Sequence, residues 1–209
     1  MPILKRKYYP HAITLNSHVF GLFGYLSPFK TLFLLVTPFN LLLSFILLVY
    51  YQTEKNKAFW LFTFIIFACG YFLEVIGVHT KLIFGDYSYG STLGISFLNV
   101  PLVMGLNWLN LIYAIGIVLN KLSLPNWIKS LIGASLLVLL DYFIEPVAMK
   151  YDFWDWKNGQ IPLQNFVAWF IISFVFLLYF YKAKFAKKNQ LALIYLISQF
   201  VFFVFLCYF

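Results

Sequence analysis

Acidic residues are few in this chain, and most of them are gathered in two stretches. Of the seven acidic residues, only Glu54 lies outside residues 74–86 and 141–155. Asp141 and Glu145 are four residues apart, so a helix would place both on one face. A carboxyl group at the edge of a long apolar run is costly and marks a candidate functional site. We therefore expect Glu74, Asp141 and Glu145 to be the catalytic residues.

The two stretches also share a sequence pattern. Residues 84–90 and 153–159 both read Phe-x-Asp-aromatic-x-x-Gly, and each copy is followed by Val/Ile-Pro-Leu and by Trp seven residues after the Pro. A glutamate precedes each copy. This regularity suggests a duplicated helix-loop-helix unit, residues 58–120 and 127–181, with both copies in the same orientation and a site between them. The residues expected to bind substrate there are Asp86, Tyr87, Tyr89, Asn107, Trp108, Trp154, Asp155, Trp156, Asn165 and Trp169.

Carboxyl groups and aromatic rings together suggest acid chemistry on an alkene. Two carboxyl groups that share a low-dielectric site cannot both ionise comfortably, so one keeps its proton near neutral pH. Aromatic faces stabilise a cation within about 6 Å of the ring centroid. Such a site could protonate an alkene and shelter the carbocation. Its apolar surroundings point to a lipid-soluble isoprenoid.

Other kinds of site have no support in the sequence. There is no P-loop, no Ser/His/Asp order, no dinucleotide-binding fingerprint and no metal-ligand spacing. His79 has no second His or Cys nearby to complete a ligand set. We therefore expect no metal and no cofactor.

Each of these features also has a simpler interpretation. Tyr and Trp at loop edges commonly form the interfacial belt of membrane proteins. The loop residues Asp86, Asp152 and Asp155 could be solvated carboxylates in the headgroup region. The carboxyl groups at the helix ends could instead make hydrogen bonds between helices.

The elements that must position these residues are membrane helices. The chain is 63% hydrophobic and 11% charged, with mean hydropathy +0.85, whereas soluble domains carry roughly 25% charged residues. At about 20 residues per crossing helix, its 209 residues leave no room for a separate soluble domain. We expect an all-α, polytopic transmembrane helix bundle of six to seven spans, a single integral-membrane domain over residues 1–209. The strong spans are 31–52, 58–78, 99–120, 127–148, 164–181 and 190–209, and a weaker one is 11–29.

Lysines indicate how the bundle is oriented. The links after the first, third and fifth strong spans carry eight lysines and the opposite links fewer, so the lysine-rich side is expected to be cytoplasmic. Lys5, Arg6 and Lys7 join that side if residues 11–29 cross, which favours seven spans. The net charge of +8 then reflects these lysines, and no nucleic-acid partner is expected. The two long links, 78–98 and 149–163, share the non-cytoplasmic face because two spans separate them.

The same residues resemble a known family. Residues 74–90 with Val100-Pro101-Leu102 and Asn107-Trp108 are similar to the first signature of the integral-membrane carotenoid biosynthesis proteins that act as carotenoid 1,2-hydratases on γ-carotene-type and bisanhydrobacterioruberin-type substrates. Residues 141–148, 153–156 and 161–169 are similar to the second. The resemblance covers residues 37–169. Two departures are Lys81, where the family pattern favours Gly, and Glu145, where Asp is common.

The resemblance implies a cofactor-free hydratase of bacterial or archaeal cell membranes. Water would add across the terminal C1,C2 double bond of a ψ end group to give a tertiary 1-hydroxy carotenoid. The expected partners are the carotenoid, water, the lipid bilayer and other carotenoid-pathway enzymes. We expect Asp141 or Glu145 to protonate C2, and Glu74 or a loop carboxylate to hold the water.

Two alternatives remain open at this point. A lycopene-type carotenoid cyclase would start with the same protonation, but an alkene of the substrate itself would capture the cation. A non-enzymatic transporter or binding protein for lipids or isoprenoids would use the two copies for alternating access.

Overall fold

The computed structural model describes residues 2–209, with side chains from Tyr9 onward. Lys5, Arg6 and Lys7, which the sequence places on the cytoplasmic side, therefore have side chains outside the described part. The structure is mostly helical, and its helices are α1 (Pro2–Tyr25), α2 (Lys30–Leu35), α3 (Thr37–Tyr50), α4 (Lys57–Thr80), α5 (Val103–Leu119), α6 (Asn126–Lys150), α7 (Leu163–Lys182) and α8 (Ala192–Tyr208).

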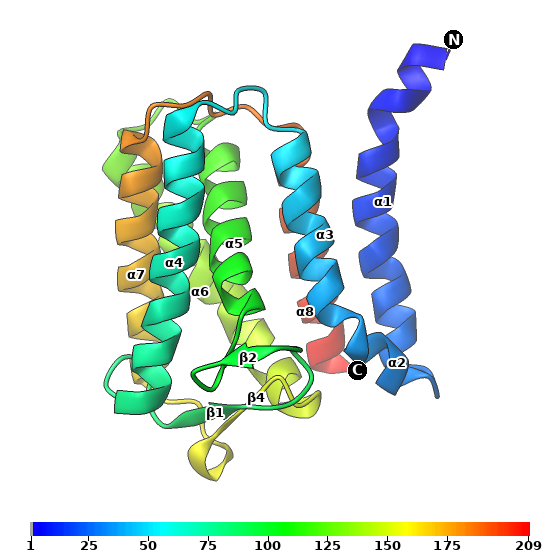
Figure 1. Cartoon of the computed structure of the whole chain (residues 1–209), viewed down its shortest axis with the longest axis vertical. Helices are drawn as coiled ribbons and strands as arrows, with labels where there is room; N and C mark the ends of the chain where they lie inside the picture. Colours follow the sequence, from blue (N-terminus) through cyan, green and yellow to red (C-terminus); the bar gives the residue numbers. More distant parts are fainter. Residues whose placement is uncertain (1) are drawn as a thin grey trace.

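The long helices form a bundle in which consecutive helices run in alternating directions (Figure 1). The links from α3 to α4, α5 to α6 and α7 to α8 lie at one end of the bundle. The links from α4 to α5 and α6 to α7 lie at the other end, as the sequence predicted. The weak stretch at residues 11–29 is largely helical, and α1 packs against α8.

The helices differ in how well they match a bilayer. Among the described residues, α4, α6 and α7 are long and apolar enough to cross a membrane. Helices α3, α5 and α8 are apolar but shorter, with 14, 17 and 17 residues, against about 20 for a full crossing. The helices therefore indicate a membrane-associated bundle, and a count of six to seven spans stays a prediction.

The expectation of an all-α chain needs one correction, because two small antiparallel sheets cap the bundle. Strand β1 (Tyr87–Tyr89) pairs with β4 (Trp154–Trp156), and β2 (Ser96–Phe97) pairs with β3 (Val100–Pro101). In the β1–β4 sheet, aromatic residues alternate with Ser88 and Asp155, so the rings share one face and the polar side chains point to the other. The sheet joins the two sequence copies directly.

Close approach between α4 and α5 is possible because of glycine. A Cβ atom on Gly70 would lie 2.7 Å from Cβ of Trp108, and one on Gly105 would lie 2.8 Å from the carbonyl oxygen of Phe67. Small residues at such contacts let membrane helices pack backbone to backbone. The contact brings Trp108, which is fully buried, against the helix that carries Glu74.

Candidate active site

Glu74 lies six residues before Thr80, the last residue of α4, and is 4% exposed. Its Oε2 accepts hydrogen bonds from the hydroxyl groups of Tyr87 (2.6 Å) and Tyr89 (2.8 Å), both on β1. Its Oε1 accepts one from the indole Nε1 of Trp108 on α5 (2.8 Å). Three donors from two elements therefore fix the orientation of this carboxyl group.

Glu145 occupies the matching place at the end of α6 and is 1% exposed. Its Oε2 accepts hydrogen bonds from Nε1 of Trp154 (2.9 Å) and Nε1 of Trp156 (2.5 Å), both on β4. Its Oε1 accepts one from Nδ2 of Asn165 on α7 (2.9 Å). Each glutamate is thus held by the strand that follows its own helix and by the next helix along the chain.

Asp141 adds a third carboxyl group one turn before Glu145. It is completely buried, and its Oδ2 accepts a hydrogen bond from the same Nδ2 of Asn165 (2.8 Å). Its Oδ1 has no hydrogen-bond partner among the described residues. One amide group therefore links the two carboxyl groups of α6. In the described part of the chain, Asp86 is the acidic residue that forms ion pairs. No lysine or arginine there therefore neutralises the three buried carboxyl groups.

A small cavity lies between the two glutamates. Its volume is about 20 Å³, which matches the space that one water molecule needs. Asp141 is not in its wall; it lies behind Asn165. The lining residues are Glu74, Phe84, Tyr87, Tyr89, Met104, Glu145, Trp154, Trp156, Asn165 and Trp169.

Aromatic side chains form much of the wall of this cavity, and several of their rings contact one another. Backbone hydrogen bonds join Asp86 to Lys157 and Gly90 to Phe153, so Tyr87 and Trp156 face each other at a position without ladder bonds, where side chains come closest. Their ring centroids are 5.1 Å apart. Trp169 lines the cavity, and Trp108, which does not, stacks against Trp169 with the ring centroids 4.2 Å apart.

The two tyrosines of β1 remain hydrogen-bond donors. Burial raises the pKa of both Tyr87 and Tyr89, and the neighbouring carboxyl group of Glu74 raises both values further. Both phenols therefore keep their protons at neutral pH and donate to Glu74. The chain supplies this carboxyl group with donors that do not titrate.

Two of the expected substrate-binding residues lie on the outer side of the sheet. Asp86 forms ion pairs with Lys81 (2.8 Å) and Lys157 (3.2 Å), and the Lys81 contact is the main cause that lowers its pKa. Asp155 is exposed between two buried tryptophans. Neither side chain lines the cavity between the glutamates, and their part in substrate binding stays a prediction.

The departure at Lys81 has a structural explanation. Lys81 follows the last residue of α4 with φ +60° and ψ 9°, a left-handed conformation. Glycine adopts this conformation without steric cost, so the backbone here would also accept a glycine. Here the lysine instead contributes an ion pair to Asp86.

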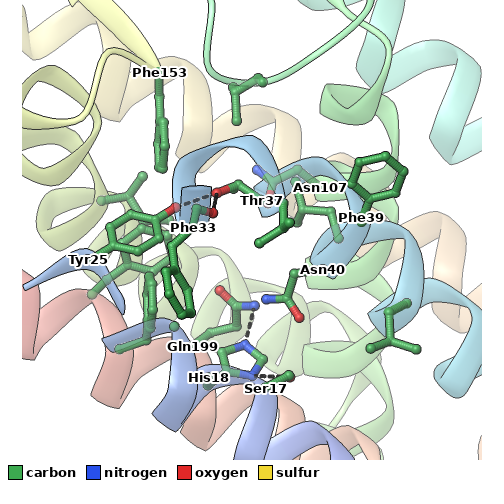
Figure 2. Close-up of a pocket in the computed structure, with 18 of the residues that line it drawn as sticks. Ser17, His18, Tyr25, Phe33, Thr37, Phe39, Asn40, Asn107, Phe153 and Gln199 are labelled. Atoms are coloured by element: carbon green, nitrogen blue, oxygen red, sulfur yellow. Dashed lines mark hydrogen bonds between the residues drawn. The ribbon is translucent and has the colours of Figure 1, made fainter. Parts of the chain in front are cut away.

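A larger cavity of about 360 Å³ lies beside the carboxyl cluster, between α1, α3, α5 and α8. Figure 2 shows its side chains, with His18, Asn40 and Gln199 grouped at one side. Nε2 of His18 accepts a hydrogen bond from Nε2 of Gln199 (3.0 Å), because Nδ1 of His18 donates to the carbonyl oxygen of Thr14 (2.8 Å). Of the residues expected to bind substrate, Asn107 and Trp154 line this cavity.

Comparison with known proteins assigns the chain to a family. A profile of the family described as "Carotenoid biosynthesis protein" matches residues 36–209. The chain belongs to this family. All three buried carboxyl groups and both glutamate-binding strands fall within the matched residues, whereas α1 precedes them.

A curated relative carries a more specific name. The bisanhydrobacterioruberin hydratase of Haloarcula japonica is 24% identical over 177 residues, which cover 81% of this chain and 60% of the relative. The chain thus spans less than two thirds of the length of that protein. No solved structure matches this chain.

Proposed function

We propose that this protein is a carotenoid hydratase that adds water across the terminal C1,C2 double bond of a ψ end group. One observation carries the proposal: two buried, hydrogen-bonded glutamates face a cavity of about 20 Å³ walled by aromatic rings. The cavity has room for one water molecule. Membership of the carotenoid biosynthesis family and the similarity to a hydratase support the same reading.

The proton donor in this mechanism is the Asp141–Glu145 pair. Glu145 lines the cavity, whereas Asp141 lies behind it and shares Nδ2 of Asn165 with it. Glu145 delivers a proton to C2 of the end group, and the π electrons of the double bond form the new C–H bond. Asp141 does not touch the cavity and is a positioning residue, because it shares Nδ2 of Asn165 with Glu145 and so helps to fix the orientation of that group.

The cation left at C1 is tertiary and forms where the end group meets this water-sized cavity, whose wall is largely aromatic. Tyr87, Trp156 and Trp169 surround the cavity, and aromatic faces stabilise a cation within about 6 Å of the ring centroid. The same rings exclude bulk water, so the cation meets only the water molecule held inside.

Glu74 is the group that activates the water. Its three hydrogen bonds from Tyr87, Tyr89 and Trp108 hold the carboxylate in place across the cavity from Glu145. The water oxygen bonds to C1, and its proton passes to Glu74. Return of that proton to Glu145 restores the site, so the net reaction is addition of one water and needs no cofactor.

The test uses purified protein in detergent and a carotene with a ψ end, with no added metal or nucleotide and under anaerobic conditions. The expected product is one water heavier. In heavy-oxygen water the hydroxyl group should carry the solvent oxygen, and in deuterated water deuterium should appear at C2. A hydroxylated product that forms only when O₂ is added back would overturn the carboxyl mechanism.

The same experiment separates the two alternatives. A product of unchanged mass with a new ring would assign the protein as a cyclase, in which an alkene of the substrate captures the cation. Binding of the carotene without conversion would assign it as a transporter or binding protein. The water-sized cavity beside Glu74 is the feature that favours hydration over cyclisation.

A further inference from the structure

The cavity of about 360 Å³ beside the carboxyl cluster is suited to a hydrocarbon. Aromatic rings form much of its wall near the capping sheet. Tyr25 packs edge-on against Phe153 and Phe202, with ring centroids 6.4 and 5.5 Å apart. Phe33 and Phe203 continue this wall (Figure 2 labels Tyr25, Phe33 and Phe153).

No fixed charge faces this cavity from the described residues. Its polar members are Ser, Thr, Tyr, Asn, Gln and His, and none of the described lining residues is Lys, Arg, Asp or Glu. A phospholipid headgroup or an isoprenoid diphosphate would therefore find no ionic partner here. The lining instead fits an uncharged, unsaturated chain.

Two residues line both this cavity and the small cavity between the glutamates, namely Met104 and Trp154. Trp154 is fixed, because it belongs to β4 and its Nε1 donates to Glu145. Met104 is 3% exposed, and its thioether chain is flexible and adapts to neighbouring groups. Met104 is thus the adjustable part of the wall between the two cavities.

We propose that the large cavity binds the terminal isoprene units of a linear polyene hydrocarbon, and that movement of Met104 admits the end group to Glu145. This inference rests on the proposed function, because it takes the reacting molecule as the ligand. It assigns α1, which precedes the residues matched by the family profile, a role in holding that ligand.

Adjacent residues of α3 give a matched test of the cavity. Leu43 lines the cavity and is 36% exposed, whereas Leu42 does not line it and is 42% exposed. Each is replaced by Trp, and each purified variant is mixed with a linear C40 polyene in detergent. The polyene retained per protein after gel filtration is then measured from its absorbance.

We expect Leu43→Trp to fill the mouth of the cavity and weaken polyene retention about tenfold or more, a change of about 1.4 kcal/mol. Leu42→Trp should retain as much polyene as the wild type. Equal retention by the two variants would overturn the assignment of the cavity, even if hydration proceeds. Displacement of the polyene by an equal amount of phospholipid would also overturn it and assign the cavity to acyl chains.

Met104 is tested separately from binding. Met104→Phe should lower the hydration rate per retained polyene about tenfold or more, because a rigid ring cannot clear the passage as the thioether does. The control is Leu102→Phe, two residues away and 42% exposed. An unchanged hydration rate in Met104→Phe would overturn the role of Met104.

Failure of the proposed function gives a different result. Suppose that the wild type retains the polyene and Leu43→Trp does not, but that neither the wild type nor any variant adds water. The assignment of the cavity would then stand, and the hydratase mechanism would be wrong.

Discussion

Trp108 and Trp169 stack with their ring centroids 4.2 Å apart and their planes 25° apart. They occupy equivalent positions in the two sequence copies, since each follows its proline by seven residues. Tyr87 and Trp156, which are also equivalent, face each other across the capping sheet. Equivalent residues contact one another only close to a two-fold axis. These contacts therefore support the hypothesis that the two helix-loop-helix units arose by duplication and meet at such an axis.

The two copies differ where the chemistry is proposed to occur. The position of Asp141 corresponds to Gly70, and the position of Asn165 corresponds to Met104, counted from the glutamate and the proline of each copy. Gly70 leaves room for the ring of Trp108. The second copy thus contributes two carboxyl groups, Asp141 and Glu145. The first copy contributes one, Glu74, together with the apolar side chain of Met104.

The first prediction concerns the buried carboxyl groups. The isosteric variants are Glu74→Gln, Asp141→Asn and Glu145→Gln. Each should lower the rate of hydration about 10²-fold or more, the scale of general acid–base catalysis, while the protein stays folded in the membrane. Asp152→Asn is the control, because Asp152 binds Ser91 with Oδ2 on the outer side of the site. Near-normal turnover in all three would leave these groups as structural hydrogen-bond acceptors.

Hydrogen-bond chemistry explains why these variants should fold. In Glu74→Gln, the new amide NH₂ can donate to the hydroxyl groups of Tyr87 and Tyr89, while the amide oxygen accepts from Trp108. In Glu145→Gln, the amide oxygen keeps both indole donors, and Nδ2 of Asn165 can still donate to Asp141. Thermal unfolding of each variant in detergent checks this expectation.

The second prediction separates two glycines that look equivalent in the sequence. A Cβ atom on Gly90 would lie 2.3 Å from the carbonyl oxygen of Asp152, whereas one on Gly159 meets nothing within 4 Å. Gly90→Ala should therefore push β1 away from β4 and lower both turnover and stability, the latter by about 1–3 kcal/mol. Gly159 has φ +66°, so Gly159→Ala should cost about 1–2 kcal/mol with turnover unchanged. Equal turnover in the two variants would contradict this account.

Much of the site can be predicted from the sequence because its signals are local. The apolar runs give the helices, and the glutamates at their ends stand close in the chain to the tyrosines and tryptophans that bind them. The strand pairing is harder to predict. Tyr-Ser-Tyr and Trp-Asp-Trp do alternate, but three residues are too few to distinguish a strand from a loop.

Contacts between residues that are far apart in the sequence are a second feature that could not be predicted. His18 weakens the apolar pattern of the first helix, yet its polarity is satisfied by Thr14 and by Gln199 near the other end of the chain. Asp86 was grouped with the site residues, but two lysines hold it on the outer surface. Thr14 and Lys81 are close in the sequence to these two residues, but Gln199 and Lys157 are far away, and nothing local reveals those two partners.

The third prediction concerns pH and Lys187, which is half-buried in the link between α7 and α8. Burial lowers the pKa of Lys187 to about 8, against about 10.4 for an exposed lysine. Between these two values the unfolded chain binds more protons than the folded protein, so stability should rise with pH. Unfolding by denaturant at pH 7.5 and 9.5 measures the slope, and Lys187→Met should reduce it. An identical slope in the variant would remove Lys187 as its source.

The fourth prediction concerns membrane orientation. Ser88 and Asp155 are exposed on the outer face of the capping sheet, and the lysine-rich links lie at the opposite end of the bundle. With Cys69 and Cys207 replaced by Ala, Ser88→Cys and Asp155→Cys should each react with a membrane-impermeant thiol reagent added outside the cell. Lys121→Cys, the control at the other end, should react only after lysis. The reverse labelling pattern would invert the proposed topology.

The fifth prediction tests whether the strands stay paired while the protein works. Ser88 and Asp155 are directly opposite in the antiparallel pair, at a hydrogen-bonded position where Cα atoms are about 5.5 Å apart, a separation that a disulfide spans. In the background without native cysteines, oxidation of Ser88→Cys/Asp155→Cys should lower the mass by two hydrogens, while Ser88→Cys/Lys121→Cys should not change. Because both strands donate to the glutamates from the opposite face of the sheet, the cross-linked protein should keep the turnover of the same variant in its reduced form. A large loss that reverses on reduction would mean that the sheet must open during the reaction.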